Sequence, residues 1–427
     1  MNIEQLYEIY KKKPSVETDT RKLKDGDIFF ALKGDNFNGN VFAEPAIEQG
    51  AAYAVIDEKE FEIPGKTILV NDVLQTLQQL AKYHRQQFSI PFLAITGSNG
   101  KTTTKELIHA VLSTSFKIYA TEGNLNNHIG IPLTILKIKE DAEIAVIEMG
   151  ANHIGEIASY CTIVLPDHGI ITNCGKAHLE GFGSEEAVRK AKGELFDHLR
   201  MLDNAVAFVN CDYDYLQQMS KGINNIIKYG TTNGADISGR VFKNDPLLEV
   251  EMTRGISEKN IKTNLVGDYN LPNVLAAIAI GNYFKIAENK IISAIENYHP
   301  SNSRSQLLQK GTNKIILDAY NANPSSLKSA IKNLSVIPAK NKVLILGAMA
   351  ELGKESIAEH EKIIDLINQY SWKAVVLVGG DFLKIDHPYL KFDNSLQAKE
   401  WLQQQDFENT YFLIKGSRSI QMEKVLD

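Results

Sequence analysis

The sequence predicts an α/β protein with largely parallel sheets, divided into two or three domains. Short runs rich in Val, Ile, Leu and Phe alternate with helix-length amphipathic segments along the whole chain, and this alternation is typical of α/β architecture. The length of 427 residues exceeds what one ordinary hydrophobic core covers, which is the reason to expect more than one domain.

Composition and charge narrow the class of protein. Apolar residues make up 44% and charged residues 23% of the chain, as in globular proteins. The 46 Lys and Arg against 52 Asp and Glu give a net charge of -6, which argues against nucleic-acid binding as the main function. No apolar stretch has the length of a membrane span and the amino terminus lacks a signal-peptide pattern, so we expect a cytoplasmic protein. Cys161, Cys174 and Cys211 lack metal-site spacing and are expected to be reduced and buried.

The first module is expected over residues 1–88. The strand-like runs IFFAL, YAVI and TILV alternate here with turns and helix-compatible segments. An amphipathic helix is predicted over residues 73–88 and ends shortly before Pro91, which places the boundary near residue 89.

The central module, expected over residues 89–301, opens on the strand FLAIT and the turn GSNGKTTT. A strand, a glycine-rich turn and a helix that begins with Lys-Thr surround an anion with backbone N–H groups and a helix amino terminus. The first glycine of the common G-x-x-x-x-G-K-T pattern would fall on Ile95, so this is a shorter form of the loop. The predicted phosphate-binding residues are Gly97, Ser98, Asn99, Gly100, Lys101, Thr102 and Thr103.

Two polar residues follow later strands of this module. Glu148 ends the run IAVIEM, and His178 follows GIIT and a turn. Because ligands bind at the carboxyl ends of strands in open α/β sheets, Glu148 can hold Mg²⁺ against the phosphates. Taken alone, Glu148 could also be a solvated strand end, and His178 a surface or core histidine.

The last module is expected over residues 302–427, after the polar stretch NYHPSNSRSQ. It contains the strand-like runs KIIL, KVLIL, AVVLVGG and YFLI. The run KVLIL leads into GAMAELG, but no G-x-G-x-x-G follows, so a dinucleotide loop is not predicted.

The order and wording of these segments resemble the Mur ligase family, the amide-bond-forming enzymes of peptidoglycan precursor assembly. TGSNGKTTTKE resembles the ATP loop of the family, and IEMGANHIGEI its strand-end acidic motif. TNCGKAHLEGFGS and KAKGELF resemble the segments that carry a metal-binding histidine and a modified lysine. The resemblance extends through GNLNNHIGIPLTIL, GDYNLPNVLAAIAIG, LDAYNANPSSLKSAI, GAMAELGKES and LIKGSRSIQMEKVL, over nearly the whole chain.

The resemblance implies a UDP-binding amino-terminal α/β domain, a central ATPase-type domain and a Rossmann-like carboxy-terminal domain. It implies ATP and two Mg²⁺ ions, with Lys192 carrying a carbamate made with CO₂; by its helix position alone Lys192 would be a solvent-facing lysine. Asn273, whose amide could otherwise cap a helix, would contact adenine. The implied metal ligands are Thr102, Glu148, His178 and Lys192, the implied catalytic residues are Lys101, Glu148, His178, Lys192 and Arg304, and Asp318 would contact the ribose.

The resemblance also implies the substrate side of the site. Thr20, Arg21 and Gly34 would bind the nucleotide sugar. The sequence departs from the family at Tyr269, where His is frequent, at Ala348, where Asp is usual, and in the segment NGN at 38–40. Further implied substrate residues are Asn126, Asn127, Tyr320, Asn321, Asn323, Lys415, Ser417 and Arg418.

The implied activity is ATP-dependent amide-bond formation through an acyl phosphate. The wording EMGANHIGEI, AHLEGFGS, YNANP and KGSRS is most similar to the members that join D-alanyl-D-alanine to UDP-N-acetylmuramoyl-tripeptide. Alternatives are an earlier-acting ligase of the family, folylpolyglutamate synthase, a P-loop kinase or nucleotide switch, and a non-catalytic precursor-binding protein. We expect a monomer.

Overall fold

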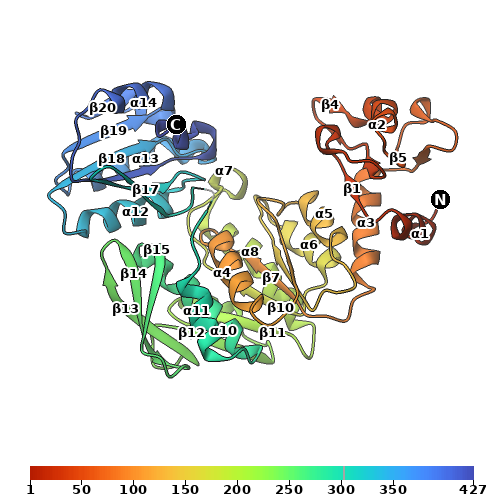
Figure 1. Ribbon diagram of the computed structural model, residues 1–427, viewed down its shortest axis with the longest axis horizontal. Coiled ribbons are helices and arrows are strands. Elements are labelled where there is room, and N and C mark those ends of the chain that lie inside the picture. Colours follow the sequence, from red (N-terminus) through yellow and green to blue (C-terminus); the bar gives the residue numbers. More distant parts are fainter. Residues whose placement is uncertain (302) are drawn as a thin grey trace.

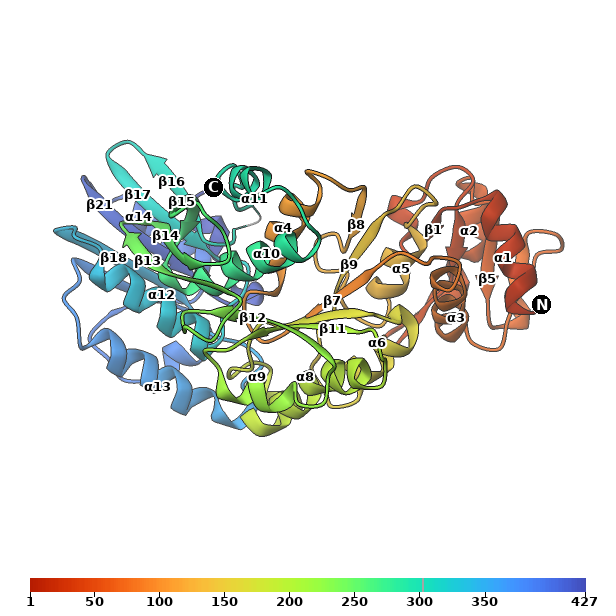
Figure 2. The same cartoon turned by 90° about the horizontal axis from the view of Figure 1, so that it is seen from below.

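The computed structural model describes residues 1–301 and 303–427 and contains three main sheets that follow one another along the chain (Figure 1). The amino-terminal and carboxy-terminal domains lie at opposite ends of the central domain, as Figures 1 and 2 both show. The predicted α/β class and three-domain organisation are confirmed. No helix among the residues described is both long and apolar enough to cross a membrane.

The amino-terminal domain is built on a parallel sheet in the order β1-β2-β5-β6, which contains the three predicted strand runs. The helix predicted over residues 73–88 ends at Arg85, because Gln87 and Phe88 turn back and donate backbone hydrogen bonds to His84 and Arg85. The strands are β1 Val16–Glu17, β2 Ile28–Phe30, β5 Tyr53–Ile56 and β6 Thr67–Leu69, with a short ribbon of β3 Lys33–Gly34 and β4 Phe37–Asn38; the helices are α1 Ile3–Lys12, α2 Ala43–Glu48 and α3 Val73–Arg85.

Arg85, at the end of α3, ties this domain to the central one. Its Nε donates to the Val164 carbonyl oxygen at 2.8 Å and its Nη2 to that of Leu165 at 2.9 Å, while Nη1 donates to Phe88 at 2.8 Å. The guanidinium also lies 3.7 Å from the ring centroid of Phe92, at the start of the central sheet. One side chain therefore satisfies carbonyl groups at the end of a central helix and stacks on a central strand.

The central sheet has nine strands in the order β15-β14-β13-β12-β11-β10-β7-β9-β8. Strands β7 to β13 and β8 pair in parallel, whereas β13, β14 and β15 form an antiparallel extension that the sequence analysis did not predict. The strands are β7 Phe92–Thr96, β8 Ile118–Ala120, β9 Ile144–Glu148, β10 His168–Ile171, β11 Val206–Asn210, β12 Asn225–Gly230, β13 Ile237–Asn244, β14 Leu247–Arg254 and β15 Asn260–Val266.

Helices cover both faces of the parallel part of this sheet (Figure 2). One face packs on α4, α10 and α11, and the other on α5, α6 and α8, each through its own hydrophobic cluster. Cys161, Cys174 and Cys211 are free and buried, as predicted. The helices are α4 Lys101–Leu112, α5 Gly130–Leu136, α6 Glu156–Val164, α7 Leu179–Phe182, α8 Glu185–Arg200, α9 Asp214–Met219, α10 Leu271–Tyr283 and α11 Glu288–Glu296.

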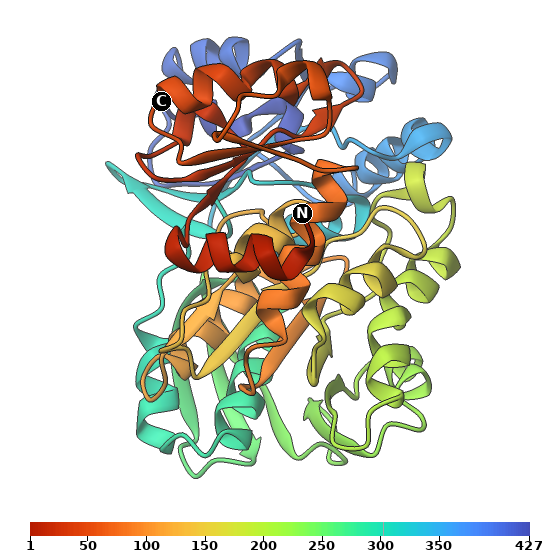
Figure 3. The ribbon, with the colours of Figure 1, turned by 90° about the vertical axis from the view of Figure 1, so that its right-hand side faces the viewer.

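The carboxy-terminal sheet has the order β16-β17-β21-β18-β19-β20 and is parallel except for β16. It lies behind the amino-terminal domain when the molecule is viewed from its right-hand side (Figure 3). Its elements are β16 Gln306–Lys310, β17 Asn313–Asp318, α12 Pro324–Val336, β18 Asn341–Gly347, α13 Ser356–Ile367, β19 Ala374–Val378, β20 Leu390–Phe392, α14 Ser395–Gln403 and β21 Thr410–Lys415.

The strand order places the candidate site. Strand β7 lies between β9 and β10, and Ile95 pairs with Glu148 while Thr96 pairs with Ile171. The carboxyl ends of these three parallel strands therefore meet at one edge, where the chain leaves β7 for the helix α4. In an open α/β sheet this is the edge at which ligands bind.

We expect the substitution Arg85→Lys to lower the free energy of unfolding by about 2–3 kcal/mol, because an ammonium cannot reproduce the three directed bonds of the guanidinium. Urea denaturation measures the change. Arg254→Lys is the matched control, since Arg254 is exposed and makes one 3.4 Å bond to Asn233. Equal effects of the two substitutions would contradict the anchoring role of Arg85.

Candidate active site

The loop between β7 and α4 needs glycine at two positions. Gly97 and Gly100 have φ values of 144° and 79°. A Cβ on Gly97 would lie 2.0 Å from the Thr172 hydroxyl oxygen, and one on Gly100 would lie 2.7 Å from Oδ1 of Asn273. Both the backbone conformation and the close approach of neighbours therefore exclude larger residues.

A segment that follows β10 holds the loop in place. The Asn99 carbonyl oxygen accepts from the Thr172 hydroxyl at 2.7 Å and from Nδ2 of Asn173 at 3.0 Å. The Ser98 hydroxyl and the Gly175 backbone exchange two bonds of 3.0 Å. Thr172 and Asn173 belong to the segment TNCGKAHLEGFGS, but the sequence indicates no role for them, because contacts between two separate loops cannot be read from spacing.

Glu148 lies behind the loop as a buried carboxylate. It is 1% exposed and accepts from the Thr102 hydroxyl at 2.9 Å and from Nδ2 of Asn126 at 2.8 Å. Lys101 Nζ donates to the Gly97 carbonyl oxygen at 2.7 Å. Burial lowers the pKa of Lys101, and the negative charge of Glu148 opposes that shift. Three predicted site residues, Lys101, Thr102 and Glu148, are thus brought together.

The surroundings of Glu148 fit a divalent cation. Its two hydrogen-bond donors are neutral, and no described Lys, Arg or His lies within ion-pair distance of its carboxylate. A buried charge of this kind needs a compensating charge, and carboxylate and hydroxyl oxygens suit Mg²⁺. Within residues 1–301 and 303–427, no three His, Cys, Asp or Glu side chains form a group that could hold a metal ion.

Lys192 on α8 faces inward and is 1% exposed, so the solvent-facing position expected from the helix alone is wrong. The reason is packing, because Val188, Leu195 and Phe196 occupy the same buried face. Its Nζ donates to the Ala151 carbonyl oxygen at 3.1 Å. Burial, reinforced by the charge of Lys101, lowers the pKa of Lys192 to about 7. The shift is in the direction that favours the neutral, nucleophilic amine.

His178 lies where the central and carboxy-terminal domains meet. Its Nδ1 lies 2.6 Å from Oε2 of Glu351, a residue of the GAMAELG segment that the sequence analysis did not single out. Nearby, Asn323 at the start of α12 donates from Nδ2 to Oδ1 of Asn99 at 2.8 Å. Residues of the carboxy-terminal domain thus contact both the phosphate loop and the histidine.

Other predicted residues of the carboxy-terminal domain form a second cluster. Lys415 Nζ lies 2.5 Å from Oδ2 of Asp318 and donates to the Asn321 carbonyl oxygen at 3.1 Å. The Arg304 guanidinium stacks 3.6 Å from the ring centroid of Tyr320. The cluster places a paired carboxylate, an amide and a stacked guanidinium together.

Asn273 contacts the loop helix through its amide. Its Oδ1 accepts from the Thr104 hydroxyl at 3.0 Å, and its Nδ2 donates to Oδ1 of Asn270 at 2.8 Å. It does not cap its own helix α10, which begins at Leu271. Its contact with adenine stays a prediction.

Some predicted residues have local partners instead. Arg21 pairs with Asp19 in its own turn at 2.8 Å, and Thr20 and Gly34 lie in the same amino-terminal domain. Oδ1 of Asn127 accepts from the backbone N–H groups of Ile129 and Gly130, just before α5. In the carboxy-terminal domain, the Ser417 hydroxyl donates to the Ala348 carbonyl oxygen at 2.6 Å, and Arg418 pairs with Glu423 at 2.7 Å.

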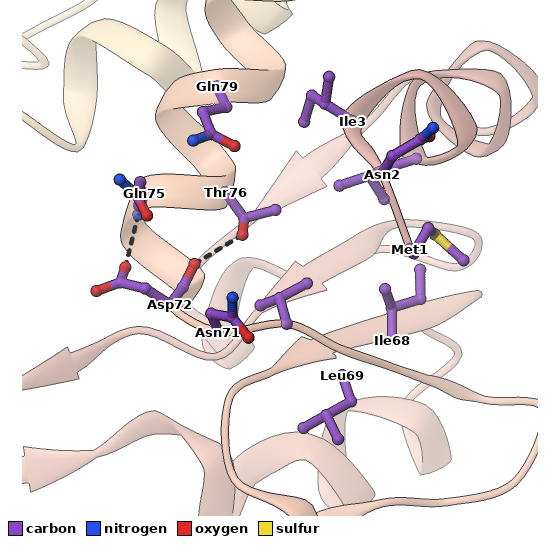
Figure 4. Close-up of a pocket in the computed structure, with 12 residues that line it drawn as sticks. Met1, Asn2, Ile3, Ile68, Leu69, Asn71, Asp72, Gln75, Thr76 and Gln79 are labelled. Carbon is purple, nitrogen blue, oxygen red and sulfur yellow. Dashed lines mark hydrogen bonds between the residues drawn. The ribbon is translucent and has the colours of Figure 1, made fainter.

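Two hollows lie in different parts of the molecule. One, of about 490 Å³, lies between α12, α13 and the segment after β10, next to the loop, and its lining includes Gly175, Lys176 and Ser325. The other, of about 310 Å³, lies in the amino-terminal domain between α1 and the start of α3 (Figure 4). In the second hollow Asp72 accepts from Gln75, and Thr76 donates to the Asp72 backbone.

Comparison with known proteins identifies similar chains over the whole length. Residues 14–86 match the Mur ligase family catalytic domain, residues 95–281 the Mur ligase middle domain, and residues 303–414 the Mur ligase glutamate ligase domain. The chain is 34% identical to the UDP-N-acetylmuramoyl-tripeptide--D-alanyl-D-alanine ligase of Bacillus subtilis, over 96% of this chain and 92% of that protein.

Two solved structures are similar in fold and sequence. The crystal structure of MurF from Acinetobacter baumannii aligns with a TM-score of 0.87 at 30% identity, covering 96% of this chain and 92% of that one. MurF from Thermotoga maritima, in complex with ADP, also gives a TM-score of 0.87, at 28% identity, covering 97% of this chain and 96% of that one.

We expect Glu148→Gln to weaken Mg²⁺-dependent binding of an ATP analogue by about tenfold or more, because the amide keeps the shape but not the charge. Isothermal titration with and without Mg²⁺ measures this. The thermal midpoint should not fall, since the substitution removes an unpaired buried charge. Glu140→Gln, at an exposed position, is the control. Unchanged Mg²⁺ dependence in Glu148→Gln would remove the carboxylate from the metal site.

Proposed function

The chain belongs to the Mur ligase family, and from this membership we propose that it joins D-alanyl-D-alanine to UDP-N-acetylmuramoyl-tripeptide at the expense of ATP. The observation that carries the proposal is a phosphate loop combined with buried Glu148 and Lys192 at one sheet edge, in a chain that aligns nearly end to end with relatives of that activity. The reaction is a step of peptidoglycan precursor synthesis, and we place it in the cytoplasm, where ATP is available.

ATP is needed because a peptide carboxylate is a poor electrophile. The carboxylate oxygen attacks the γ-phosphorus, the bond from that phosphorus to ADP breaks, and an acyl phosphate forms. The amine of D-alanyl-D-alanine then attacks the acyl carbon, loses a proton, and expels inorganic phosphate as the C–N bond forms. A site that excludes water protects this labile intermediate and keeps both reactants close together.

The loop residues bind and orient the phosphates in this proposal. Lys101 and the amino terminus of α4 offer positive charge and N–H donors to the transferring group. Thr102, Glu148, His178 and modified Lys192 would hold Mg²⁺. Bound Mg²⁺ neutralises charge on the phosphoryl group during transfer. Arg304, on the connection between the domains, would reach the phosphates when the domains close.

We further propose that Lys192 carries a carbamate. A neutral amine attacks the carbon of CO₂ and releases a proton, which converts a cation into a carboxylate-like ligand. The burial of Lys192 and its lowered pKa of about 7 support this, because both favour the neutral amine. The carbamate would also remove the positive charge of Lys192 from the neighbourhood of Lys101, whose own positive charge lowers the pKa of Lys192.

The three domains divide the substrates among them. We assign residues 1–88 to the nucleotide sugar, 89–301 to ATP, and 302–427 to the incoming dipeptide and closure over the site, in a chain that acts as a monomer. The nucleotide-sugar residues would be Thr20, Arg21 and Gly34, the nucleotide residues would include Asn273 and Asp318, and the other substrate contacts would come from Asn126, Asn127, Tyr320, Asn321, Asn323, Lys415, Ser417 and Arg418.

The activity is tested by phosphate release from ATP and Mg²⁺ in the presence of UDP-N-acetylmuramoyl-tripeptide. We expect release that requires D-alanyl-D-alanine, together with a nucleotide product heavier by one dipeptide residue. Mass spectrometry identifies the product, and exchange of the third residue of the tripeptide defines which peptide is accepted. If phosphate release instead requires a single amino acid or a folate substrate, and the dipeptide does not support it, the protein is a different ligase of the family.

The carbamate is tested by ¹³C NMR of the protein in ¹³C-bicarbonate. We expect a carbamate carbonyl resonance that Lys192→Gln abolishes together with most of the activity. Lys190→Gln is the matched control, because Lys190 lies on the same helix but is exposed. A resonance that survives Lys192→Gln, or full activity of that variant, would rule out the modification as a ligand.

A further inference from the structure

One contact joins the proposed metal side of the site to the carboxy-terminal domain. His178 belongs to the central domain, and Glu351 lies between β18 and α13. Nδ1 of His178 lies 2.6 Å from Oε2 of Glu351. Their side chains are 24% and 49% exposed, so neither is held by burial alone.

Both residues adopt a backbone conformation that is uncommon for residues other than glycine. The φ values are 51° at His178 and 62° at Glu351. Left-handed residues with a bulky side chain persist where the surrounding structure requires them, and such positions are concentrated at functional sites. Here two of them face each other across a domain junction. The other described non-glycine residues with positive φ are Leu165, Lys285, Ser303, Ser305, Asn409 and Gln421.

The short helix α7, which directly follows His178, is held at its start by the carboxy-terminal domain. The Glu180 N–H donates to the Glu351 carbonyl oxygen at 3.0 Å. Leu179 is 9% exposed and belongs to the hydrophobic cluster of the carboxy-terminal domain, together with Met349 and Leu352. A residue of the central domain is therefore part of the core of its neighbour.

The other end of α7 is held by the central domain. Phe182 is 8% exposed, belongs to the core of the central domain, and has its ring centroid 5.3 Å from Nζ of Lys192. A Cβ on Gly181 would lie 2.4 Å from the Asn152 carbonyl oxygen, so the helix also packs tightly on the segment after β9. One turn of helix thus connects the core of the carboxy-terminal domain to the side chain of Lys192.

We propose that Glu351 is a positioning residue that fixes His178 when the carboxy-terminal domain docks, so that the metal side of the site is assembled only in the docked state. This rests on the proposed function for the role of His178 at the metal. The Glu351 carboxylate lies 2.6 Å from Nδ1 of the imidazole and restrains it, as carboxylates do for metal-ligating histidines.

Because the backbone at Glu351 is left-handed, the choice of substitution can distinguish the role of the side chain from an effect on the fold. Glu351→Asn keeps a residue that tolerates positive φ and keeps the carbonyl bonded to Glu180, but removes the reach and charge of the carboxylate. Glu351→Gln keeps the reach and removes only the charge. Glu355→Gln is the control, since Glu355 is exposed in the same connection. The full-length chain is used throughout.

For Glu351→Asn we expect a thermal midpoint equal to or above that of the parent, together with a fall in kcat of about 10- to 100-fold and a higher Mg²⁺ requirement. KM for ATP should change little, and Glu351→Gln should lie between the parent and Glu351→Asn. Independently of turnover, electron paramagnetic resonance of Mn²⁺ bound with ADP should show about tenfold weaker Mn²⁺ affinity in Glu351→Asn than in Glu355→Gln.

If Glu351→Asn retains both the kcat and the Mn²⁺ affinity of Glu355→Gln within about twofold, the positioning role is overturned. A fall in kcat that follows only from a lowered thermal midpoint, with Mn²⁺ affinity unchanged, overturns it as well. The proposed function can fail separately. If the parent shows no dipeptide-dependent phosphate release but Mn²⁺ affinity still falls in Glu351→Asn, the coupling stands without that activity.

Discussion

The structure depends on one constraint: its candidate site contains buried charged groups that no opposite charge in the protein fully neutralises. Glu148 and Lys192 are each 1% exposed, and each is bonded to neutral groups. A buried charge without compensation costs several kcal/mol, so a fold retains such a group where a ligand or a chemical change supplies the compensation. The strand order of the central sheet and the packing of α8 bring these groups to the edge beside the phosphate loop.

The domains meet over this edge through polar contacts. Asn323 bonds to Asn99 of the loop at 2.8 Å, and Lys176 pairs with Glu359 across the same junction at 2.8 Å. Polar interfaces of this kind suit domains that separate and return, because their groups are satisfied by water when the domains part. Apolar contacts also cross the junction, because Leu179 and Val266 of the central domain belong to the hydrophobic cluster of the carboxy-terminal domain. Leu179 makes the helix after His178 sensitive to where the carboxy-terminal domain lies.

Sequence patterns predicted the elements whose structure is decided locally. The strand runs of the three domains, the glycine loop and the helix that opens on Lys101 follow from period and turn chemistry, and all are present. The antiparallel strands β13 to β15 were missed although β14 and β15 alternate between buried and more exposed residues, so the period-2 pattern of LLEVEMTR could have predicted at least one of them. The burial of Lys192 and the contact between His178 and Glu351 depend on how helices and domains pack. No spacing in the chain encodes that packing.

The central claim, that metal and carbamate compensate the buried charges, is tested most directly by diffraction. Crystals grown with a non-hydrolysable ATP analogue, Mn²⁺ and bicarbonate would show anomalous scatterers at the metal positions. The account predicts Mn²⁺ within about 2.5 Å of oxygens of Thr102 and Glu148, and planar density extending from Nζ of Lys192 towards a second ion. An unmodified Lys192 and no ion at Glu148, with the nucleotide analogue bound in the loop, would contradict it.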